Sequence, residues 1–353
     1  MKIGRLPENV LKRSVLRQIQ TKREEIINGA GIGEDCAVFS FGGNGIMMTC
    51  VQTAAVKAKE SGPPGKQECR VCMGHLIQRC ANDLAAAGAR PVGITIALTL
   101  PEEAEEPDIR ALMADAEAKC RELNIQIAGG QTRISGAVRQ PVAAVTGYGK
   151  CFEPENDGSN VGEAAGEMSG IGKYPAAVRA GQDIVISKWI GLEGTAILAE
   201  RYRDKLLERY PAYFVEEAAG FERLLSVIPE AATAMKSGVC MMHDASEGGI
   251  FGCLWELAER AGVGLTIDLK KLPLRQETVE VCECCNVNPY ELLSGGALVM
   301  VTEDGPGLLE TLKAEKIPAA IVGRVTDSND RIIRNGEETR FLDRPKSDEI
   351  YRQ

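Results

Sequence analysis

Residues 82–91 read Asn82-Asp83-Leu84-Ala85-Ala86-Ala87-Gly88-Ala89-Arg90-Pro91, and the hydrophobic period changes within this stretch. Upstream of it, from residue 68, apolar side chains recur at helical spacing, and a glycine at position 88 is typical of a helix end. Downstream, residues 92–100 form an apolar run of strand length. The sequence therefore predicts a helix over 68–88 that is followed directly by a strand over 92–100.

The rest of the first half mixes helices and strands in the same way. An amphipathic helix is predicted over 8–20, and another begins at Pro101 and the acidic run after it. The buried side of that second helix is expected to carry Ile109, Leu112, Met113, Ala116, Cys120 and Leu123. Strands are expected over 37–39, 46–51, 125–128 and 142–148, the first two joined by a hairpin-type connection. This order is typical of an α+β or mixed α/β fold.

The second half has its own alternation of strands and helices. Strands are predicted over 183–187, 239–242, 265–267, 297–302 and 319–325. A turn over 191–194 leads into a helix from Thr195, and a turn over 244–249 leads into a helix over 250–261. The alternation favours a layered α/β domain.

The chain has 353 residues, about twice the usual domain size, which favours two domains. Residues 152–182 are rich in glycine and lack a sustained apolar period, so they form the natural junction. We therefore predict an N-terminal domain over 1–155, a junction over 156–180, a C-terminal domain over 181–345 and a tail over 346–353.

The amino-acid composition indicates which classes of binding partner and which cellular location to expect. Lysine and arginine number 41 and aspartate and glutamate 50, giving a net charge of −9, so nucleic acid and anionic membranes are not expected as partners. Residues 1–20 lack a signal-peptide core, and the apolar run over 92–100 is too short to span a bilayer, so a cytoplasmic location is expected. Several of the 12 cysteines are then expected to be reduced, buried thiols, namely Cys36, Cys50, Cys80, Cys120, Cys240 and Cys253.

Four segments combine a strand or helix end, an acidic residue and glycine, as expected where a backbone approaches phosphate and carboxylates hold a hard cation. They are Gly31 to Val38 with Asp35, the 82–91 stretch with Asp83, Gly129 to Arg133, and His243 to Gly249 with Asp244. Each has a purely structural alternative. Asp83 could pair with Arg79 one turn earlier, and Asp35 could form an Asx turn. The glycine pair could be a tight strand exit, and the last segment could be a helix N-cap through Ser246 or Asp244.

Cysteine spacing offers a competing site. The pairs Cys69/Cys72 and Cys282/Cys285 could supply thiolates to zinc or act as a redox centre. However, Cys72 continues the apolar stripe of a predicted helix, and the two pairs belong to different predicted domains. Packing is therefore the favoured role of the cysteines.

Taken together and in this order, the acidic and glycine segments resemble the family of aminoimidazole ribonucleotide synthetase. This superfamily also contains thiamine monophosphate kinase, selenophosphate synthetase and the carbamoyl dehydratase of hydrogenase maturation, and the resemblance is closest to the hydrogenase maturation branch. It extends to two further segments, Gly191-Leu192-Glu193-Gly194-Thr195-Ala196-Ile197-Leu198-Ala199 and Ser294-Gly295-Gly296-Ala297-Leu298.

The resemblance implies an N-terminal mixed sheet that joins a second subunit as a barrel, a C-terminal α/β domain, and ATP with Mg2+ in the cleft. It implies a homodimer that acts on a small-molecule substrate. Asp35 and Asp83 would be magnesium ligands, and Asp244 would face the cleft from the second domain. The residues expected near the phosphates are Asn82, Gly129, Gly130, Gln131 and Thr132. No residue is assigned a catalytic role.

Three departures from the family pattern shape the functional hypotheses. The family's threonine-aspartate pair is replaced by Val51-Gln52-Thr53-Ala54, and Arg133 follows Gln131 and Thr132 where an acid is frequent. The chain ends Ile350-Tyr351-Arg352-Gln353 rather than in the cysteine of the hydrogenase maturation factor, so that particular activity is not expected. The first hypothesis is an ATP- and magnesium-dependent enzyme that phosphorylates an amide-type oxygen. The alternative is a catalytically degenerate homodimer that binds nucleotide or metabolite without turnover.

Overall fold

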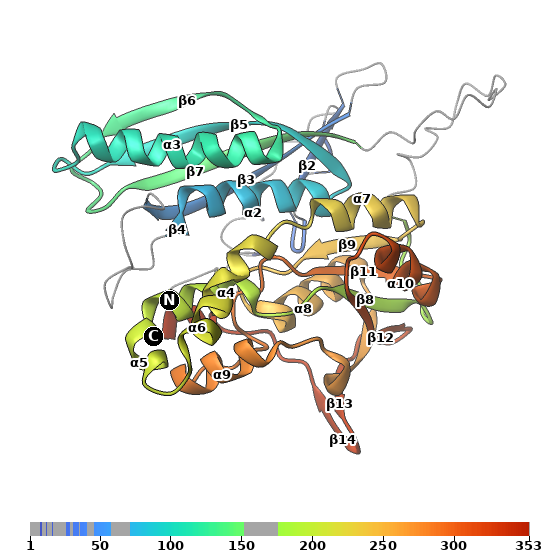
Figure 1. Ribbon diagram of the computed structural model, residues 1–353. Helices are drawn as coiled ribbons and strands as arrows, with labels where there is room; N and C mark the ends of the chain where they lie inside the picture. Colours follow the sequence, from blue (N-terminus) through green and yellow to red (C-terminus); the bar gives the residue numbers. More distant parts are fainter. Residues whose placement is uncertain are drawn as a thin grey trace.

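The computed structural model describes residues 8, 12, 16, 26–28, 31–34, 36–40, 46–57, 71–151 and 176–352. This part of the chain forms two seven-stranded sheets that lie one above the other in Figure 1. The first sheet has the order β1-β2-β3-β7-β5-β6, and β4 pairs with β3 off this path. Its strands are β1 (Ile26–Asn28), β2 (Ala37–Ser40), β3 (Ile46–Lys57), β4 (Val71–Cys72), β5 (Ala89–Leu100), β6 (Gln126–Ile134) and β7 (Val142–Cys151).

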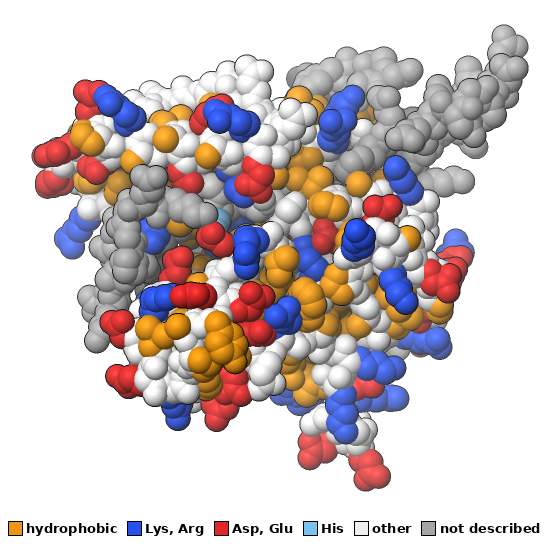
Figure 2. Space-filling view, viewed as in Figure 1, with side chains coloured by type: hydrophobic (Ala, Val, Ile, Leu, Met, Phe, Trp, Pro, Cys, Tyr) orange, Lys and Arg blue, Asp and Glu red, His pale blue; other side chains and the backbone are white. Residues whose placement is uncertain are grey.

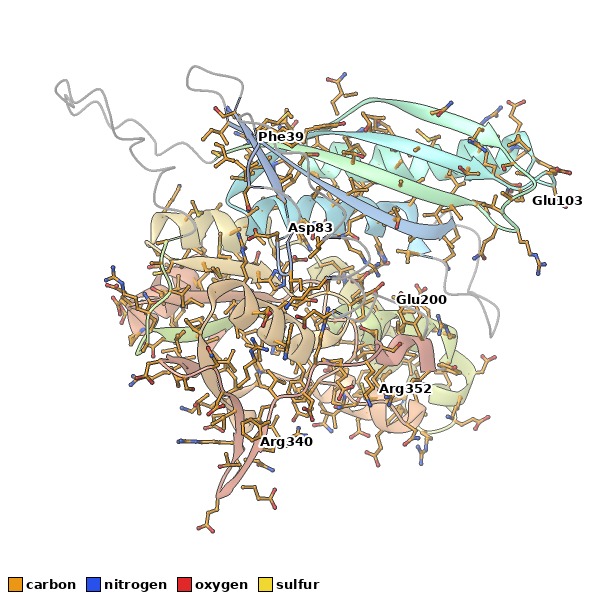
Figure 3. The ribbon with its side chains drawn as sticks, turned by 180° about the vertical axis from the view of Figure 1, so that it is seen from behind. Phe39, Asp83, Glu103, Glu200, Arg340 and Arg352 are labelled. Carbon is orange, nitrogen blue, oxygen red and sulfur yellow. The ribbon has the colours of Figure 1, made fainter. Side chains whose placement is uncertain are left out.

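Helices cover one face of the first sheet. They are α2 (Met73–Ala86) and α3 (Glu106–Leu123), and α3 begins with a capping box between Glu105 and Asp108. Side chains of β3, β5 and β7 alternate, so that every second residue is buried against the helices. Figure 3, seen from behind, shows the strands in front of these helices. The face turned away from the helices carries mainly alanine, threonine and valine, including the exposed Val51 and Val92.

The second sheet has the order β14-β13-β10-β12-β8-β11-β9. Its strands are β8 (Asp183–Ser187), β9 (Met241–Asp244), β10 (Gly264–Asp268), β11 (Leu298–Thr302), β12 (Ala319–Thr326), β13 (Arg331–Asn335) and β14 (Glu338–Phe341). The α-helices around it are α4 (Leu192–Arg201), α5 (Arg203–Leu207), α6 (Ala212–Ala219), α7 (Ile228–Lys236), α8 (Gly249–Ala261), α9 (Gln276–Cys285) and α10 (Gly305–Ala314). Short 3-10 turns are η3 (Gly220–Leu224), η4 (Leu269–Lys271) and η5 (Glu349–Arg352).

The two layers share a packed core at α2. Ala85 and Ala86 on its last turn are fully buried in one cluster with Val227, Ala231 and Met242 of the second layer. Small side chains at this point let α2 approach α7 and β9 closely. The helix α2, whose last turns include the first residues of the 82–91 stretch, therefore lies between the two sheets (Figure 1).

The mixed α+β class is confirmed, and the strands over 92–100 and 183–187 are present. The helix expected to begin at Pro101 begins only at Glu106, after a turn. Leu112, Ala116 and Cys120 are buried as expected. The helix predicted over 68–88 begins only at Met73, because Val71 and Cys72 pair with β3 as a strand. Of the helix predicted over 8–20, only Glu8, Lys12 and Leu16 are among the described residues.

Two other element boundaries differ from the predicted ones. β3 extends to Lys57 because β7 pairs with it as far as Ala55 and β4 pairs with Val56 and Lys57. The helix α4 already begins at Leu192, since Gly191 adopts a left-handed conformation with a φ of 73° and its carbonyl accepts from the Thr195 amide. The first sheet ends at Cys151 and the second begins at Asp183, while the proposed junction lies largely outside the described residues.

The cysteines are packing residues. Ten of the eleven described cysteines are buried, including all six for which burial was predicted. Burial raises the pKa of Cys282 to about 12 and that of Cys285 to about 11, which disfavours the thiolate needed for zinc or redox chemistry. Cys69 lies outside the described residues. Among the helices that the structure describes, none has the length and apolar character to cross a membrane.

Candidate active site

A cavity of about 410 Å3 lies where the two layers meet. The first domain contributes β3 and α2 to its walls, and the second contributes the turn before α8, the loop before β11 and the 3-10 turn η5. The lining residues are Val51, Gln52, Thr53, Arg79, Ser246, Glu247, Leu293 and Tyr351. This inter-domain pocket is polar on several sides, as expected of a site that orients a small molecule.

Asp83 lies beside this pocket, on the side of α2 that faces the second domain (Figure 3). Its side chain is 6% exposed, and the Gln52 side-chain amide donates a 2.7 Å hydrogen bond to its Oδ2. Gln52 occupies part of the segment where the family pattern has an acid, so an amide donor faces Asp83 there. That hydrogen bond replaces some of the hydration that a buried carboxylate loses.

Arg79 is one turn before Asp83 but has a different partner from the one considered from sequence. Its guanidinium contacts Oε1 of Glu193 on α4, with Nε at 2.8 Å and Nη2 at 2.7 Å. Both side chains are largely buried, and the Glu193 charge helps to raise the pKa of Arg79 against its desolvation. Gly295 lies so close that a Cβ there would be 2.2 Å from Oε2 of Glu193. The two glycine segments of the second domain therefore enclose an ion pair that joins the domains.

Asn82 acts as a clamp between the domains. Its Oδ1 accepts from the Val227 amide at 3.1 Å and from Gln78 at 2.9 Å, and its Nδ2 donates to the Leu225 carbonyl at 2.7 Å. The side chain is 1% exposed. In this arrangement both the oxygen and the nitrogen of the amide group have protein partners, and the expected place of Asn82 near phosphates stays a prediction.

The glycine pair is not in a turn. Gly129, Gly130, Gln131 and Thr132 all lie within the edge strand β6, which pairs in parallel with β5 and has an extra residue at Ala128. A side chain at position 130 would put its Cβ 2.0 Å from the Ile96 carbonyl oxygen, which explains the glycine there. The register places Gly130 in one row with Ile96, Val145 and Gln52, three strand spacings of about 4.8 Å from β3. The stretch is therefore about 14 Å from the pocket wall of its own chain.

From the segment 243–249, Ser246 and Glu247 line the pocket. Asp244 is the last residue of β9 and is 3% exposed. The N-cap residue of α8 is Gly248, with a φ of 89° and no side-chain cap, so the structural alternative in which Ser246 or Asp244 is the N-cap residue does not hold. The Gly248 amide instead donates to Asp348, 100 residues later.

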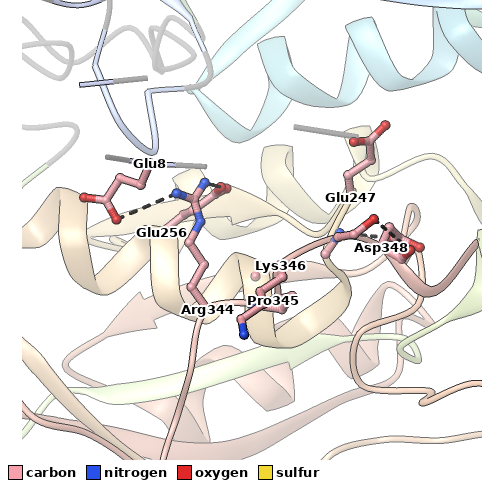
Figure 4. A pocket seen from close by; sticks show the side chains of 10 residues that line it. Glu8, Glu247, Glu256, Arg344, Pro345, Lys346 and Asp348 are labelled. Carbon is pink, nitrogen blue, oxygen red and sulfur yellow. Dashed lines mark hydrogen bonds and ion pairs between the residues drawn. The ribbon is translucent and has the colours of Figure 1, made fainter. Parts of the chain in front are cut away.

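Residues 346–352 return to the pocket as a distinct segment. Asp348 is 3% exposed and accepts from the amides of Gly248 at 2.7 Å, Ile350 at 2.8 Å and Leu293 at 3.1 Å. The Tyr351 hydroxyl donates to Oε1 of Glu247 at 2.6 Å. A second cavity of about 210 Å3 lies on the other side of this segment, and Figure 4 shows Glu247 and Asp348 at one end of it.

Attachment of this segment is expected to depend on pH. Burial raises the pKa of Asp348 from 3.8 to about 7, aided by the nearby Glu247 charge and opposed by the three amide donors. The docked segment therefore holds a proton that the free segment has lost, so docking weakens as the pH rises from about 4 to 7 and changes little above. Hydrogen exchange of residues 346–352, corrected for intrinsic rates, is expected to give a smaller opening free energy at pH 8 than at pH 5.5. The Asp348→Asn variant is expected to lose this difference, and an unchanged difference would contradict the assignment.

Asp35 lies outside the described residues, so a joint site with Asp83 stays a prediction. Among the residues that the structure describes, no three His, Cys, Asp or Glu side chains are arranged to hold a metal ion. Asp83 supplies a hard oxygen donor of the kind that magnesium prefers, and Glu247 brings a second carboxylate to the pocket wall. A single protein carboxylate fits a magnesium ion that is also held by nucleotide phosphates, since Mg2+ commonly binds in this way.

Family models match most of the chain. The N-terminal domain of AIR synthase related protein matches residues 33–151, and the C-terminal domain of AIR synthase related protein matches residues 179–334. The chain belongs to the AIR synthase related protein family. Asp83, Arg79 and Glu193 lie within these matched ranges, so the resemblance inferred from the motifs is confirmed.

Among its curated relatives, this AIR synthase related protein is similar to two hydrogenase maturation proteins. A putative hydrogenase expression/formation protein of Methanocaldococcus jannaschii is 25% identical over 99% of this chain and 96% of the relative. A carbamoyl dehydratase HypE of Rhodobacter capsulatus is 29% identical over 69% of this chain and 66% of the relative.

Solved structures of HypE have the same fold. A crystal structure of a HypE–HypF complex matches with a TM-score of 0.67 and 24% identity, covering 89% of this chain and 94% of that one. A HypE crystal structure in complex with ATP matches with a TM-score of 0.63 and 18% identity, covering 99% and 97%. The two-layer architecture is therefore that of the family.

Sequence reasoning did not find Arg79, Glu247, Leu293 or Tyr351 as pocket residues. Arg79 carried a usable signal, since it shares a helix face with Asp83. Glu193, its partner, is the one acid within the Gly191-Leu192-Glu193-Gly194 segment. Tyr351 carried no local signal, because its place depends on a segment distant in sequence that returns to the pocket.

Proposed function

We propose that this AIR synthase related protein is an ATP-dependent enzyme that phosphorylates an amide-type oxygen of a small molecule. The observation that carries the proposal is the inter-domain pocket beside Asp83, in a chain whose relatives are named carbamoyl dehydratases and whose fold matches a HypE bound to ATP. Phosphorylation turns an amide oxygen into a phosphate leaving group. Such transfer depends chiefly on positioning and charge neutralisation, for which carboxylate-held metal and backbone donors suffice.

Asp83 is the residue that would hold magnesium, which would neutralise phosphate charge when bound. Gln52 fixes the orientation of this carboxylate through its 2.7 Å hydrogen bond. Asp35 is the proposed second ligand, and Asn82 and Asp244 are proposed nucleotide contacts. Because Gly129 to Thr132 is about 14 Å from its own pocket wall, a role near phosphates requires this stretch to act on the nucleotide of a second subunit.

A second candidate function is nucleotide or metabolite binding without turnover. It is favoured by Gln52, because an amide already satisfies an oxygen of Asp83, and by Arg133, which adds a cation on β6. Titration calorimetry with a non-hydrolysable ATP analogue, with and without Mg2+, tests binding. Phosphate release in the presence of small amides then separates the two candidates. Magnesium-dependent binding with release supports the enzyme, and binding without release supports the alternative.

Small-molecule partners and a cytoplasmic location also remain proposals. On the face shown in Figure 2, lysine and arginine side chains are interspersed with aspartate and glutamate. A mixed surface of this kind, with a net charge of −9, suits a small-molecule enzyme better than a protein that follows a phosphate backbone.

The open face of the first sheet is the proposed homodimer surface. Thr53, Ala144 and Ala97 lie in one row across β3, β7 and β5, and Thr95 and Tyr148 contact each other at 3.3 Å on the same face. Small side chains and exposed valines suit close packing against a second sheet. This is the surface at which two copies would form the barrel.

The Ala97→Arg variant is expected to be monomeric, because a buried unpaired charge costs several kcal/mol at a sheet interface. Light scattering after size-exclusion chromatography measures the mass of each species. Ala118→Arg places the same charge on the exposed side of α3 and is expected to leave the mass unchanged. A wild-type chain that elutes as a monomer would refute the dimer.

A further inference from the structure

Residues 346–352 lie between two cavities and are called the strap here. Lys346, Ser347 and Asp348 line the smaller cavity of about 210 Å3, and Tyr351 lines the inter-domain pocket of about 410 Å3. Glu247 borders both. The strap therefore forms part of the wall of both cavities, and Glu247 is a residue that the two walls share.

The strap is attached to the same turns that form the pocket wall. Asp348 accepts from Gly248 in the turn before α8 and from Leu293 in the loop before β11. Tyr351 donates to Glu247, and Oε2 of Glu349 accepts from the Asn288 amide at 3.2 Å. These are polar contacts to backbone amides and one carboxylate, and each can be exchanged for a contact with water or with a polar ligand.

Charge makes the docked strap easy to displace. Three acids gather around its attachment points, namely Glu247, Asp348 and Glu349, and Asp348 and Glu349 are each no more than 3% exposed. Arg352 pairs with Glu349, while the Arg79 guanidinium is already bonded to Glu193. Repulsion among these buried carboxylates opposes docking of the strap. The burial of Ile350 in an apolar cluster favours docking. Because the unfavourable charge interactions offset part of the favourable burial, the strap is expected to open locally without unfolding of the rest of the chain.

We propose that the strap is a self-closing gate of the inter-domain pocket, which must swing away before the small-molecule ligands of the proposed function bind fully. The proposal rests on that function for the identity of the ligand, although not for the opening itself. When the strap leaves, the Tyr351 ring vacates the pocket, and the amides of Gly248 and Leu293 become free donors. Because only the open form is competent to bind, the apparent dissociation constant is raised by the reciprocal of the open fraction.

The opening is tested without any ligand by native-state hydrogen exchange of the full chain. Peptides that carry the amides of Gly248, Leu293 and Ile350 are expected to exchange at least about 100-fold faster than peptides from β11, and to do so without dependence on added denaturant. Exchange of these amides only together with β11 would overturn the gate, because the strap would then open only on global unfolding.

The gating is tested with a non-hydrolysable ATP analogue and Mg2+ as the probe, by titration calorimetry. Tyr351→Phe, which removes only the hydroxyl bonded to Glu247, is expected to tighten binding about tenfold, and a chain that ends at Pro345 at least as much. Tyr213→Phe is the matched control, because it removes the same hydroxyl from a tyrosine on α6 that is 74% exposed, and its affinity is expected to equal that of wild type.

The outcomes separate the gate from the proposed function. Equal or weaker affinity in Tyr351→Phe, with binding intact in wild type, overturns the gating. Rapid exchange of the strap amides together with no binding of the analogue to any variant supports an opening strap and refutes the proposed ATP-dependent function. If the chain that ends at Pro345 does not fold, Tyr351→Phe and the hydrogen-exchange comparison decide the matter.

Discussion

Replacement of Asp83 by asparagine is expected to lower ATP turnover at least about 100-fold, because metal-borne charge neutralisation contributes several kcal/mol to phosphoryl transfer. Asparagine has nearly the same shape and still accepts the hydrogen bond from Gln52, so the fold is expected to survive. Phosphate release measures turnover, and titration with the ATP analogue at several Mg2+ concentrations measures the metal dependence. The loss is expected to be larger with Mg2+ than without it.

Asp327→Asn is the matched control for this prediction. It makes the same change of charge on an exposed aspartate after β12, and its turnover is expected to equal that of wild type. A melting temperature of Asp83→Asn close to that of wild type would show that lost turnover is not lost folding. If Asp83→Asn kept full, magnesium-dependent turnover, the place of Asp83 as metal ligand would be refuted.

Replacement of Arg79 by methionine is expected to lower the free energy of unfolding by about 3–5 kcal/mol, because it leaves the buried Glu193 carboxylate without its partner. The side chains involved are 12% and 2% exposed, so water replaces little of the lost interaction. Urea denaturation of the single and double variants measures the effect. The result would show how much of the contact between the domains depends on this ion pair.

The Arg79→Met/Glu193→Gln double variant is expected to recover most of that loss, since no unpaired charge remains. Lys119→Met, which breaks the partly exposed pair between Lys119 and Glu122 on α3, is the comparison and is expected to cost about 1 kcal/mol or less. A double variant as unstable as the sum of the two single variants would show that Arg79 and Glu193 are not coupled.

Local patterns were sufficient where one segment determines its own structure. The helix Glu106–Leu123 was predicted, with a start five residues too early, because its apolar spacing and acidic start are visible within 18 residues. The extension of β6 through Gly129 and Gly130 was not predicted, since glycine at these positions is typical of a turn. Pairing with β5 holds this segment in an extended conformation. The bulge at Ala128 likewise depends on a partner strand that the hydrophobic period does not identify.

The candidate site was predictable to the extent that its residues lie in glycine and acid segments. Asp83 was found in this way, and the structure places it beside the pocket. The residues that surround Asp83 were not predicted. The hydrophobic period of a helix shows which of its faces is buried, but not which residues pack against that face. Arg79 and Glu193 are 114 residues apart, and Gly248 and Asp348 are 100 residues apart. Contacts at such separations arise from the docking of the domains and of the strap.

The burial of ten cysteines also gives this chain a built-in set of unfolding reporters. Cys50 and Cys80 are buried in the first domain, and Cys282 and Cys285 are buried in the second. A thiol reagent reacts with such side chains only after the surrounding structure opens, because burial shields the sulfur and disfavours the thiolate. Pulses of reagent followed by mass spectrometry can therefore time the opening of each domain separately, without adding a label to the protein.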